Sequence, residues 1–277
     1  MNTEKDIKEM VRQKYSEIAL QDKNASSCCS SDGYGTEEVH NMMMNDDYST
    51  LDGYNPDADL GLGCGLPTQF AKIKKGDTVI DLGSGAGNDC FIARAETGEA
   101  GKVIGIDFTD AMIVKARTNA EKLGYNNVEF RLGDIEKLPV NANIADVIVS
   151  NCVLNLVPNK QAVFSEIYRV LKQGGHFSIS DIVVTGTLPE QIKTAAEMYS
   201  GCVAGAIDKD EYLNLISQTG FANVTIQKDK PIIVPDDILK NYLNDEQISQ
   251  YKANASVIRS ITVYAEKTDC DPNSNCC

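Results

Sequence analysis

Nine cysteines are the most distinctive chemical feature of this 277-residue sequence. Thiolates bind soft metals and metalloids and take part in redox reactions. Five of the nine lie in two local clusters: Cys28, Cys29, Cys270, Cys276 and Cys277. The other four stand singly: Cys64, Cys90, Cys152 and Cys202. In a reducing compartment we expect most of them to be thiols, which favours soft-metal or redox chemistry over a disulfide scaffold.

The cysteine spacing differs from that of a zinc finger, because the sequence contains no CxxC pair and no histidine close to a cysteine. The two histidines, His40 and His176, are predicted to be structural or exposed to solvent. We therefore do not expect a histidine-based metal site or a histidine general base. For any single cysteine the ordinary alternative is a small core residue, and we retain that interpretation for Cys90.

A glycine-rich turn, Asp81-Leu82-Gly83-Ser84-Gly85-Ala86-Gly87, connects an expected strand to an expected helix. Glycines in such a turn let the backbone approach a ligand closely. Asp107 lies at the end of the next strand, where a carboxylate can accept hydrogen bonds from both hydroxyls of a ribose. A dinucleotide site is the competing interpretation, but it requires its third glycine at position 88, which is asparagine. Asp134, after the third strand, could reach an adenine amino group.

Short apolar segments that alternate with amphipathic ones predict the fold. We expect strands at 78–82, 102–108, 128–132, 145–151 and 176–184, and helices at 4–20, 87–97, 110–124, 160–172, 189–203 and 208–219. Two further strands, 223–228 and 257–266, could complete the sheet antiparallel at one edge. This order predicts an α/β fold, a doubly wound, mostly parallel, Rossmann-like sheet with a smaller C-terminal α+β extension.

The same pattern divides the chain into four parts. We expect an N-terminal helix and cysteine-containing loop over 1–60, a nucleotide-binding domain over 61–186, a C-terminal region over 187–267 that forms a lid, and a disordered tail over 268–277. Ligands of open parallel sheets bind at the carboxyl ends of the strands. Cys152 follows the fourth strand, Cys202 lies in the helix after the fifth, and Cys64 stands between glycines just before the sheet. Each could reach one common site.

Charge and hydropathy exclude other classes of partner. The net charge is −14 and there is no basic run, so a nucleic acid is not expected to bind. No apolar run is long enough to cross a membrane, and the first residues lack the pattern of a signal peptide. We therefore expect a cytoplasmic protein with no membrane partner.

The segments VIDLGSGAG, GIDFTDAM and GDIEKLP resemble the S-adenosylmethionine-dependent Rossmann-like methyltransferases over residues 76–185. The resemblance implies that S-adenosylmethionine is the cofactor. It implies that the turn binds the methionine moiety, that Asp107 binds the ribose with Met112 nearby, and that Asp134 and Ile135 surround the adenine. The turn residues so implied are Asp81, Gly83, Ser84, Gly85 and Gly87.

A closer resemblance covers residues from about 60 to 220. The segments GLGCG, DLGSGAGNDC, SNCVLNLVP and SGCVAGA together resemble the arsenite methyltransferases. This implies that Cys64, Cys152 and Cys202 bind trivalent arsenic, and that Asn151 lies at the cofactor edge. Implied substrates are arsenite and methylarsenite, with thioredoxin or glutathione as reductant.

The resemblance also implies an auxiliary cysteine that forms a transient disulfide with the first arsenic ligand, and Cys28 and Cys29 are both candidates. The tail cysteines either capture and deliver arsenic or have no function. Two rival functions remain open. A methyltransferase for a small organic acceptor would need a base or an aromatic pocket, but the sequence has no tryptophan and only 6% aromatic residues. A metalloid-sequestering protein would not need the glycine turn, Asp107 and Asp134.

Overall fold

The computed structural model describes residues 4–20, 46–186, 205–234, 236–240, 243–253 and 257–268. Several residues and segments singled out from the sequence lie outside these ranges. They are His40, the expected helix 189–203, and the cysteines Cys28, Cys29, Cys202, Cys270, Cys276 and Cys277.

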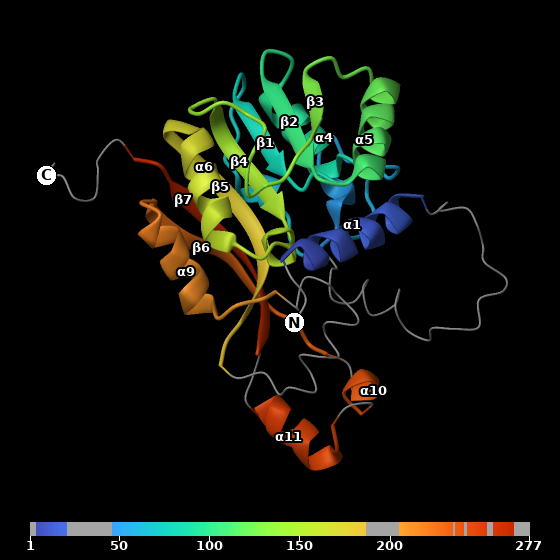
Figure 1. Ribbon diagram of the computed structural model, residues 1–277, viewed down its shortest axis with the longest axis vertical. Coiled ribbons are helices and arrows are strands. Elements are labelled where there is room, and N and C mark those ends of the chain that lie inside the picture. The colour runs from blue at the N-terminus through green and yellow to red at the C-terminus, as the bar shows by residue number, and fades with distance from the viewer. Residues whose placement is uncertain are drawn as a thin grey trace, which may run out of the picture.

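A seven-stranded sheet with the order β3-β2-β1-β4-β5-β7-β6 forms the centre of the molecule (Figure 1). Strands β1 to β5 pair in parallel, and β7 runs antiparallel to both β5 and β6. This confirms the predicted fold, including the two antiparallel strands at one edge. The strands are β1 (Thr78–Leu82), β2 (Lys102–Asp107), β3 (Val128–Leu132), β4 (Ala145–Asn151), β5 (Leu171–Val184), β6 (Ala222–Pro231) and β7 (Ile258–Glu266).

Helices cover both faces of the sheet, α4 and α5 on one side and α6 and α9 on the other (Figure 1). The alternation of side chains along β1 explains the two layers, because Ile80 and Leu82 pack with the α6 and α9 side whereas Val79 packs with the α4 and α5 side. The helices are α1 (Glu4–Leu20), α3 (Pro67–Phe70), α4 (Asn88–Thr97), α5 (Asp110–Leu123), α6 (Lys160–Val170), α9 (Lys209–Gln218), α10 (Asp236–Leu239) and α11 (Asp245–Ala253), with 3-10 turns η1 (Tyr48–Thr50) and η2 (Leu154–Leu156).

The boundary between α6 and β5 differs from the prediction. We expected a helix to continue to residue 172 and the strand to begin at residue 176, but α6 ends at Val170 and β5 begins at Leu171. Leu171 has an extended backbone and pairs with Ala145 of β4, and Lys172 forms an ion pair with Asp146 at 2.8 Å. Pairing with the neighbouring strand therefore overrides the helical pattern of the sequence.

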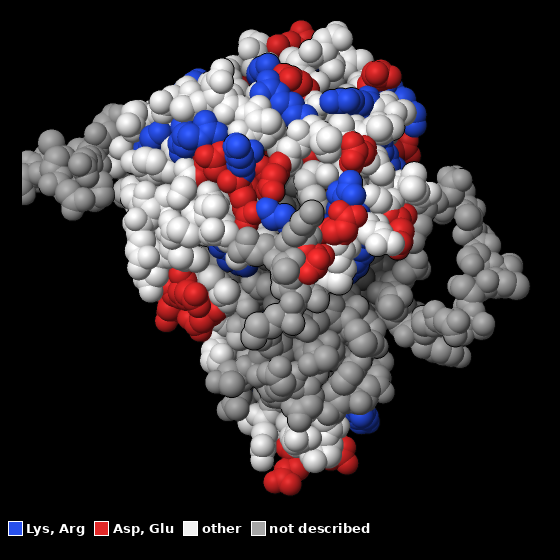
Figure 2. Space-filling view, in the orientation of Figure 1, with Lys and Arg blue, Asp and Glu red and all other residues white. Residues whose placement is uncertain are grey.

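The C-terminal part adds strands to the same sheet and two short helices, α10 and α11, which we did not predict. None of the helices in the described ranges has the length and apolar character needed to cross a membrane. On the face seen in Figure 2, Lys and Arg side chains are interspersed with Asp and Glu over the coloured surface.

Candidate functional site

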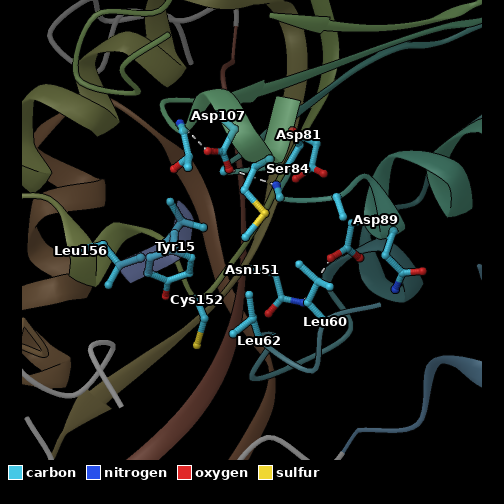
Figure 3. Close-up of a pocket in the computed structure, with 18 of the residues that line it drawn as sticks. Tyr15, Leu60, Leu62, Asp81, Ser84, Asp89, Asp107, Asn151, Cys152 and Leu156 are labelled. Atoms are coloured by element: carbon cyan, nitrogen blue, oxygen red, sulfur yellow. Dashed lines mark hydrogen bonds between the residues drawn. The ribbon is translucent and has the colours of Figure 1, made fainter. Parts of the chain in front are cut away.

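A pocket that opens to solvent lies at the carboxyl ends of β1, β2 and β4. Its walls come from the turn after β1, the residues after β2 and β4, the loop that precedes the sheet, and α1 (Figure 3). This is the position at which open parallel sheets bind ligands. Most of the predicted cofactor residues line it: Asp81, Gly83, Ser84, Gly85, Asp107, Met112, Asp134, Ile135 and Asn151.

Asp107 organises the glycine turn through both of its carboxylate oxygens. Its Oδ2 accepts a hydrogen bond from the backbone N–H of Gly85 at 3.0 Å, and its Oδ1 accepts one from Thr109 N–H at 2.8 Å (Figure 3). Each oxygen keeps a further lone pair. Asp107 is therefore oriented to accept hydrogen bonds from two hydroxyl groups of a ligand in the pocket.

The turn has the features expected of a site for a polar ligand. Ser84 lines the pocket, and its hydroxyl oxygen is buried without a hydrogen-bond partner in the structure. Gly85 has a backbone φ of +52°, and a Cβ atom there would meet nothing within 4 Å, so its pocket side is open. A buried hydroxyl costs free energy unless it is paired, so a ligand group that pairs Ser84 Oγ is favoured. These residues fit the polar methionine end of S-adenosylmethionine.

Gly87, in contrast, does not line the pocket in the described structure. A Cβ atom at this position would lie 2.8 Å from the ring of Phe91 and 2.9 Å from that of Phe130. Close packing at the start of α4 therefore accounts for this glycine.

Carboxylates crowd the same pocket, because Asp59, Asp81, Asp89 and Asp107 all line it. Burial raises the pKa of Asp81 well above its usual value, and the charge of Asp89 adds to the effect. Burial also raises the pKa of Asp89 to about 6, against hydrogen bonds from Asn151, Tyr48 and Thr68 that lower it. Burial also raises the pKa of Asp107, although the hydrogen bonds that its carboxylate accepts from backbone N–H groups lower it in part. Such a cluster favours a cationic ligand, because a positive charge offsets the repulsion between the carboxylates.

Asp89→Asn is expected to raise the melting temperature of the ligand-free protein at pH 7.5 and to leave it unchanged near pH 4. The folded-state pKa of Asp89 lies above that of an unfolded aspartate, about 3.9. The native state therefore loses stability as the pH rises from about 4 to about 6, and an amide removes this loss. Melting curves across this range test the expectation. A wild-type advantage at pH 7.5 would contradict it.

The N-terminal helix α1 forms one wall of the pocket, which the sequence did not indicate. Lys8 and Tyr15 line the pocket, and Lys8 Nζ donates to Asp134 Oδ2 at 2.6 Å and also to Glu136. Near the other end of α1, Lys115 Nζ donates to the carbonyl of Ala19 at 3.1 Å. Ion pairs thus fasten α1 to the loop after β3, next to the residue predicted to contact adenine.

Lys8→Met is expected to weaken S-adenosylmethionine binding several-fold and to speed proteolysis within α1. The substitution removes both ion pairs of Lys8 and leaves Asp134 and Glu136 close together without a cation. The matched control is Arg12→Met on the same helix, since Arg12 forms an ion pair with exposed Glu9 and does not line the pocket. Calorimetry and limited digestion with a glutamate-specific protease, whose sites in α1 both variants retain, measure the two effects. Equal behaviour of the two variants would exclude a role for Lys8 in closing the pocket.

Two of the three predicted arsenic ligands meet at the edge of this pocket. Cys64 and Cys152 are 88 residues apart in sequence, yet their Cα atoms are 5.7 Å apart and their sulfurs form a disulfide. We expected thiols here, so the structure differs from the prediction. Both residues are 3% exposed, and the backbone places them within the normal range for a disulfide. Cys152 lines the pocket (Figure 3). Cys64 is not among the lining residues and lies in the loop that precedes the sheet.

The other predicted cysteines divide into one that is described and several that are not. Cys90 is fully buried as expected, and its Sγ lies 3.2 Å from Asp81 Oδ2. Burial raises the pKa of the Cys90 thiol well above its usual value, and the charge of Asp81 adds to this, so the thiol is inert. His176 is also structural, as its Nε2 lies 2.6 Å from the carbonyl oxygen of Ala71. Cys202, Cys28 and Cys29 lie outside the described residues.

The residues that sequence reasoning missed are Tyr48, Asp89, Lys8 and Tyr15, all of which line the pocket. Asp89 carried the best signal, because it lies at the start of the helix that follows the glycine turn. Lys8 and Tyr48 had none, since the elements that carry them reach the pocket only through the tertiary fold.

Comparisons with known proteins place this fold among the methyltransferases. A family model described as a methyltransferase domain matches residues 73–220. The crystal structure of an arsenic(III) S-adenosylmethionine methyltransferase from Chlamydomonas reinhardtii is 30% identical with a TM-score of 0.64, and the match covers 83% of this chain and 74% of that one. The fold and cofactor class are therefore those of an S-adenosylmethionine-dependent methyltransferase.

Relatives with curated names identify the family more specifically. The arsenite methyltransferase of Halobacterium salinarum is 40% identical over 265 residues, which are 91% of this chain and 66% of the relative. The human arsenite methyltransferase is 36% identical over 192 residues, 66% of this chain and 51% of the relative. The chain thus spans between about half and two thirds of the length of these relatives. It belongs to the family of arsenite methyltransferases.

Proposed function

We propose that the protein transfers the methyl group of S-adenosylmethionine to trivalent arsenic held by the thiolates of Cys64, Cys152 and Cys202. The convergence of Cys64 and Cys152 beside the pocket carries the proposal. Thiolates are the proper ligands of a soft, thiophilic centre. Three sulfurs on arsenic would leave one lone pair, which is the nucleophile that the reaction needs.

The protein's contribution would be proximity and orientation. The bound sulfonium supplies an electrophilic methyl group, and Cys152 would hold arsenic at the wall of the same pocket. Holding two reactants in a near-attack geometry can lower a barrier by about 7–11 kcal/mol. A general base is not required, because a lone pair carries no proton to lose. This agrees with a pocket whose described lining contains no histidine.

Electron balance makes the thiols reactants as well as ligands. Methyl transfer from the sulfonium oxidises arsenic from the trivalent to the pentavalent state. Two thiolates can return it to the trivalent state by giving up two electrons and forming a disulfide, which an external thiol then reduces. We propose thioredoxin or glutathione as that reductant, the cytoplasm as the compartment, and arsenic detoxification as the purpose. The oxidised pair Cys64–Cys152 must likewise be reduced before it binds arsenic.

The decisive experiment incubates the protein with arsenite, a thiol and S-adenosylmethionine labelled in its methyl group, and separates the arsenic species by chromatography. Labelled methylarsenicals are expected. Arsenic binding without label would instead indicate sequestration, and inertness towards arsenic would favour a small organic acceptor.

A further inference from the structure

The hydroxyl of Tyr48 lies in a buried hydrogen-bond network between the cofactor pocket and the loop that carries Cys64. Tyr48 Oη lies 3.0 Å from Asp89 Oδ2 and 3.0 Å from the carbonyl oxygen of Gly65, and either can accept its single proton. It also accepts a hydrogen bond from Asn151 Nδ2. Tyr48 is 8% exposed, and burial raises its pKa well above the usual value, so the hydroxyl stays protonated. The phenol thus joins three separate parts of the chain.

Asn151 connects this network to both arsenic-site cysteines. Its side-chain oxygen accepts from the backbone N–H of Cys64 at 3.0 Å, and its Nδ2 donates to the carbonyl of Gly65 at 2.8 Å. Its Nδ2 also lies 3.2 Å from Asp89 Oδ2. Cys152 is the next residue in the chain. The orientation of one amide therefore fixes the backbone on both sides of Cys64 relative to Cys152.

The loop that carries Cys64 has little freedom to shift away from Asn151 and Tyr48. A Cβ atom on Gly63 would lie 2.6 Å from Asn151 Nδ2 and 3.1 Å from Tyr48 Oη, and one on Gly65 would lie 2.5 Å from Ser180 Oγ. On the opposite side, the carbonyl of Cys64 accepts a hydrogen bond from Ser260 Oγ at 2.6 Å. The backbone lies directly against the network, so a change in the network is transmitted to the Cys64 sulfur.

We propose that Tyr48 is a positioning residue that, through Asn151 and Asp89, sets the approach of the Cys64 sulfur to the Cys152 sulfur. It touches neither thiol, so it acts through the loop backbone. The inference deepens the proposed function, because the same approach would govern how both thiols hold arsenic. It does not need arsenic to be tested, since the two sulfurs report on their own proximity by forming a disulfide.

Removing the hydroxyl by Tyr48→Phe leaves the ring and its packing in place. Asn151 then loses a hydrogen-bond acceptor, and the single Tyr48 hydroxyl proton is no longer available to Asp89 or to the Gly65 carbonyl. A typical intramolecular hydrogen bond contributes about 1 kcal/mol, which corresponds to roughly five- to tenfold in an equilibrium constant. The amide of Asn151 becomes free to turn, and the two sulfurs should meet less often.

The test equilibrates the full-length protein in buffers of fixed ratio of reduced to oxidised glutathione. Peptide mass spectrometry then measures the fraction of chains with Cys64 joined to Cys152. Tyr264→Phe is the matched control, because Tyr264 is also buried and also donates to a carboxylate, Glu266 Oε1 at 2.6 Å, but does not line the pocket. We expect the equilibrium constant for the disulfide to fall roughly tenfold in Tyr48→Phe and to stay within twofold in the control. Equal values for wild type and Tyr48→Phe would overturn the proposal.

A second measurement separates positioning from a loss of stability. If arsenite is methylated, kcat should fall roughly tenfold in Tyr48→Phe, and any rise in the KM for S-adenosylmethionine, whose pocket Tyr48 also lines, should be smaller than this fall. An unchanged kcat, or a rise in that KM with kcat intact, would overturn a positioning role. If the wild type does not methylate arsenite, the proposed function fails, and the glutathione equilibrium still decides the role of Tyr48.

Discussion

Cys152→Ser is expected to abolish methyl transfer to both arsenite and methylarsenite while leaving S-adenosylmethionine binding intact. Cys152 is the one described cysteine that lines the pocket, so its sulfur would present arsenic to the bound cofactor. A serine hydroxyl is a hard, protonated ligand and does not replace a thiolate on arsenic. Losing the held geometry should lower the rate at least about 1,000-fold. Chromatography of arsenic products and calorimetry with S-adenosylmethionine measure the two effects.

Cys64→Ser provides the matched contrast. Methylarsenite has only two positions that exchange with thiols, so one of the three sulfurs becomes dispensable in a second methylation. Cys64 is not among the residues that line the pocket, whereas Cys152 is, which makes Cys64 the ligand that can be spared. We expect this variant to lose arsenite methylation and to retain that of methylarsenite. Full activity of Cys152→Ser on either substrate, or equal losses of both activities in Cys64→Ser, would refute this assignment.

The sheet could be predicted from the sequence because its central strands are continuous apolar segments that end at turns. The segment at β1 is buried on both faces of the sheet, and the glycine turn follows it directly. Local pattern failed at β5, where the pairing of Leu171 with Ala145 and the ion pair of Lys172 with Asp146 continue the strand towards α6. Propensity describes one segment, whereas strand pairing depends on two.

The candidate site was predictable to the extent that its residues follow strands. Asp107 is the last residue of β2 and Cys152 comes directly after β4, so parallel pairing alone brings them to one edge. Tyr48 and Lys8 reach the pocket from a 3-10 turn and from an N-terminal helix that do not belong to the sheet. No spacing rule relates such residues to Asp89 or Asp134. Their roles arise from packing between distant parts of the chain.

The disulfide between Cys64 and Cys152 likewise could not be predicted from the sequence. Sequence spacing of 88 residues gives no distance, and the cysteine count alone favoured thiols. In the fold, Cys152 N–H donates to the carbonyl of Ser180 at 2.8 Å and Ser260 Oγ donates to the carbonyl of Cys64 at 2.6 Å. These hydrogen bonds to residues of β5 and β7 therefore hold the two cysteines within reach of each other. The proximity that allows oxidation is the proximity that a shared arsenic atom would need.

Asp107→Asn is expected to weaken S-adenosylmethionine binding roughly 100-fold or more. The carboxylate of Asp107 accepts from two backbone N–H groups and retains lone pairs that could accept both hydroxyls of a ribose. An amide replaces one of the oxygens with a donor, which would face the N–H of Gly85 or of Thr109. Hydrogen bonds to a charged group contribute about 1.5–3 kcal/mol each, so the loss of two corresponds to roughly 100-fold or more in affinity.

Asp110→Asn is the control for this loss, because Asp110 lies three residues further along, is exposed at the start of α5, and does not line the pocket. Both substitutions remove one negative charge from the same part of the protein, so a general electrostatic effect would weaken binding equally in both. Calorimetry at pH 7.5 separates the two causes. If the carboxylate oxygens of Asp107 accept hydrogen bonds from the ligand, only Asp107→Asn loses affinity for S-adenosylmethionine. Comparable losses in both variants would assign the effect to net charge and would refute Asp107 as the acceptor for the ribose.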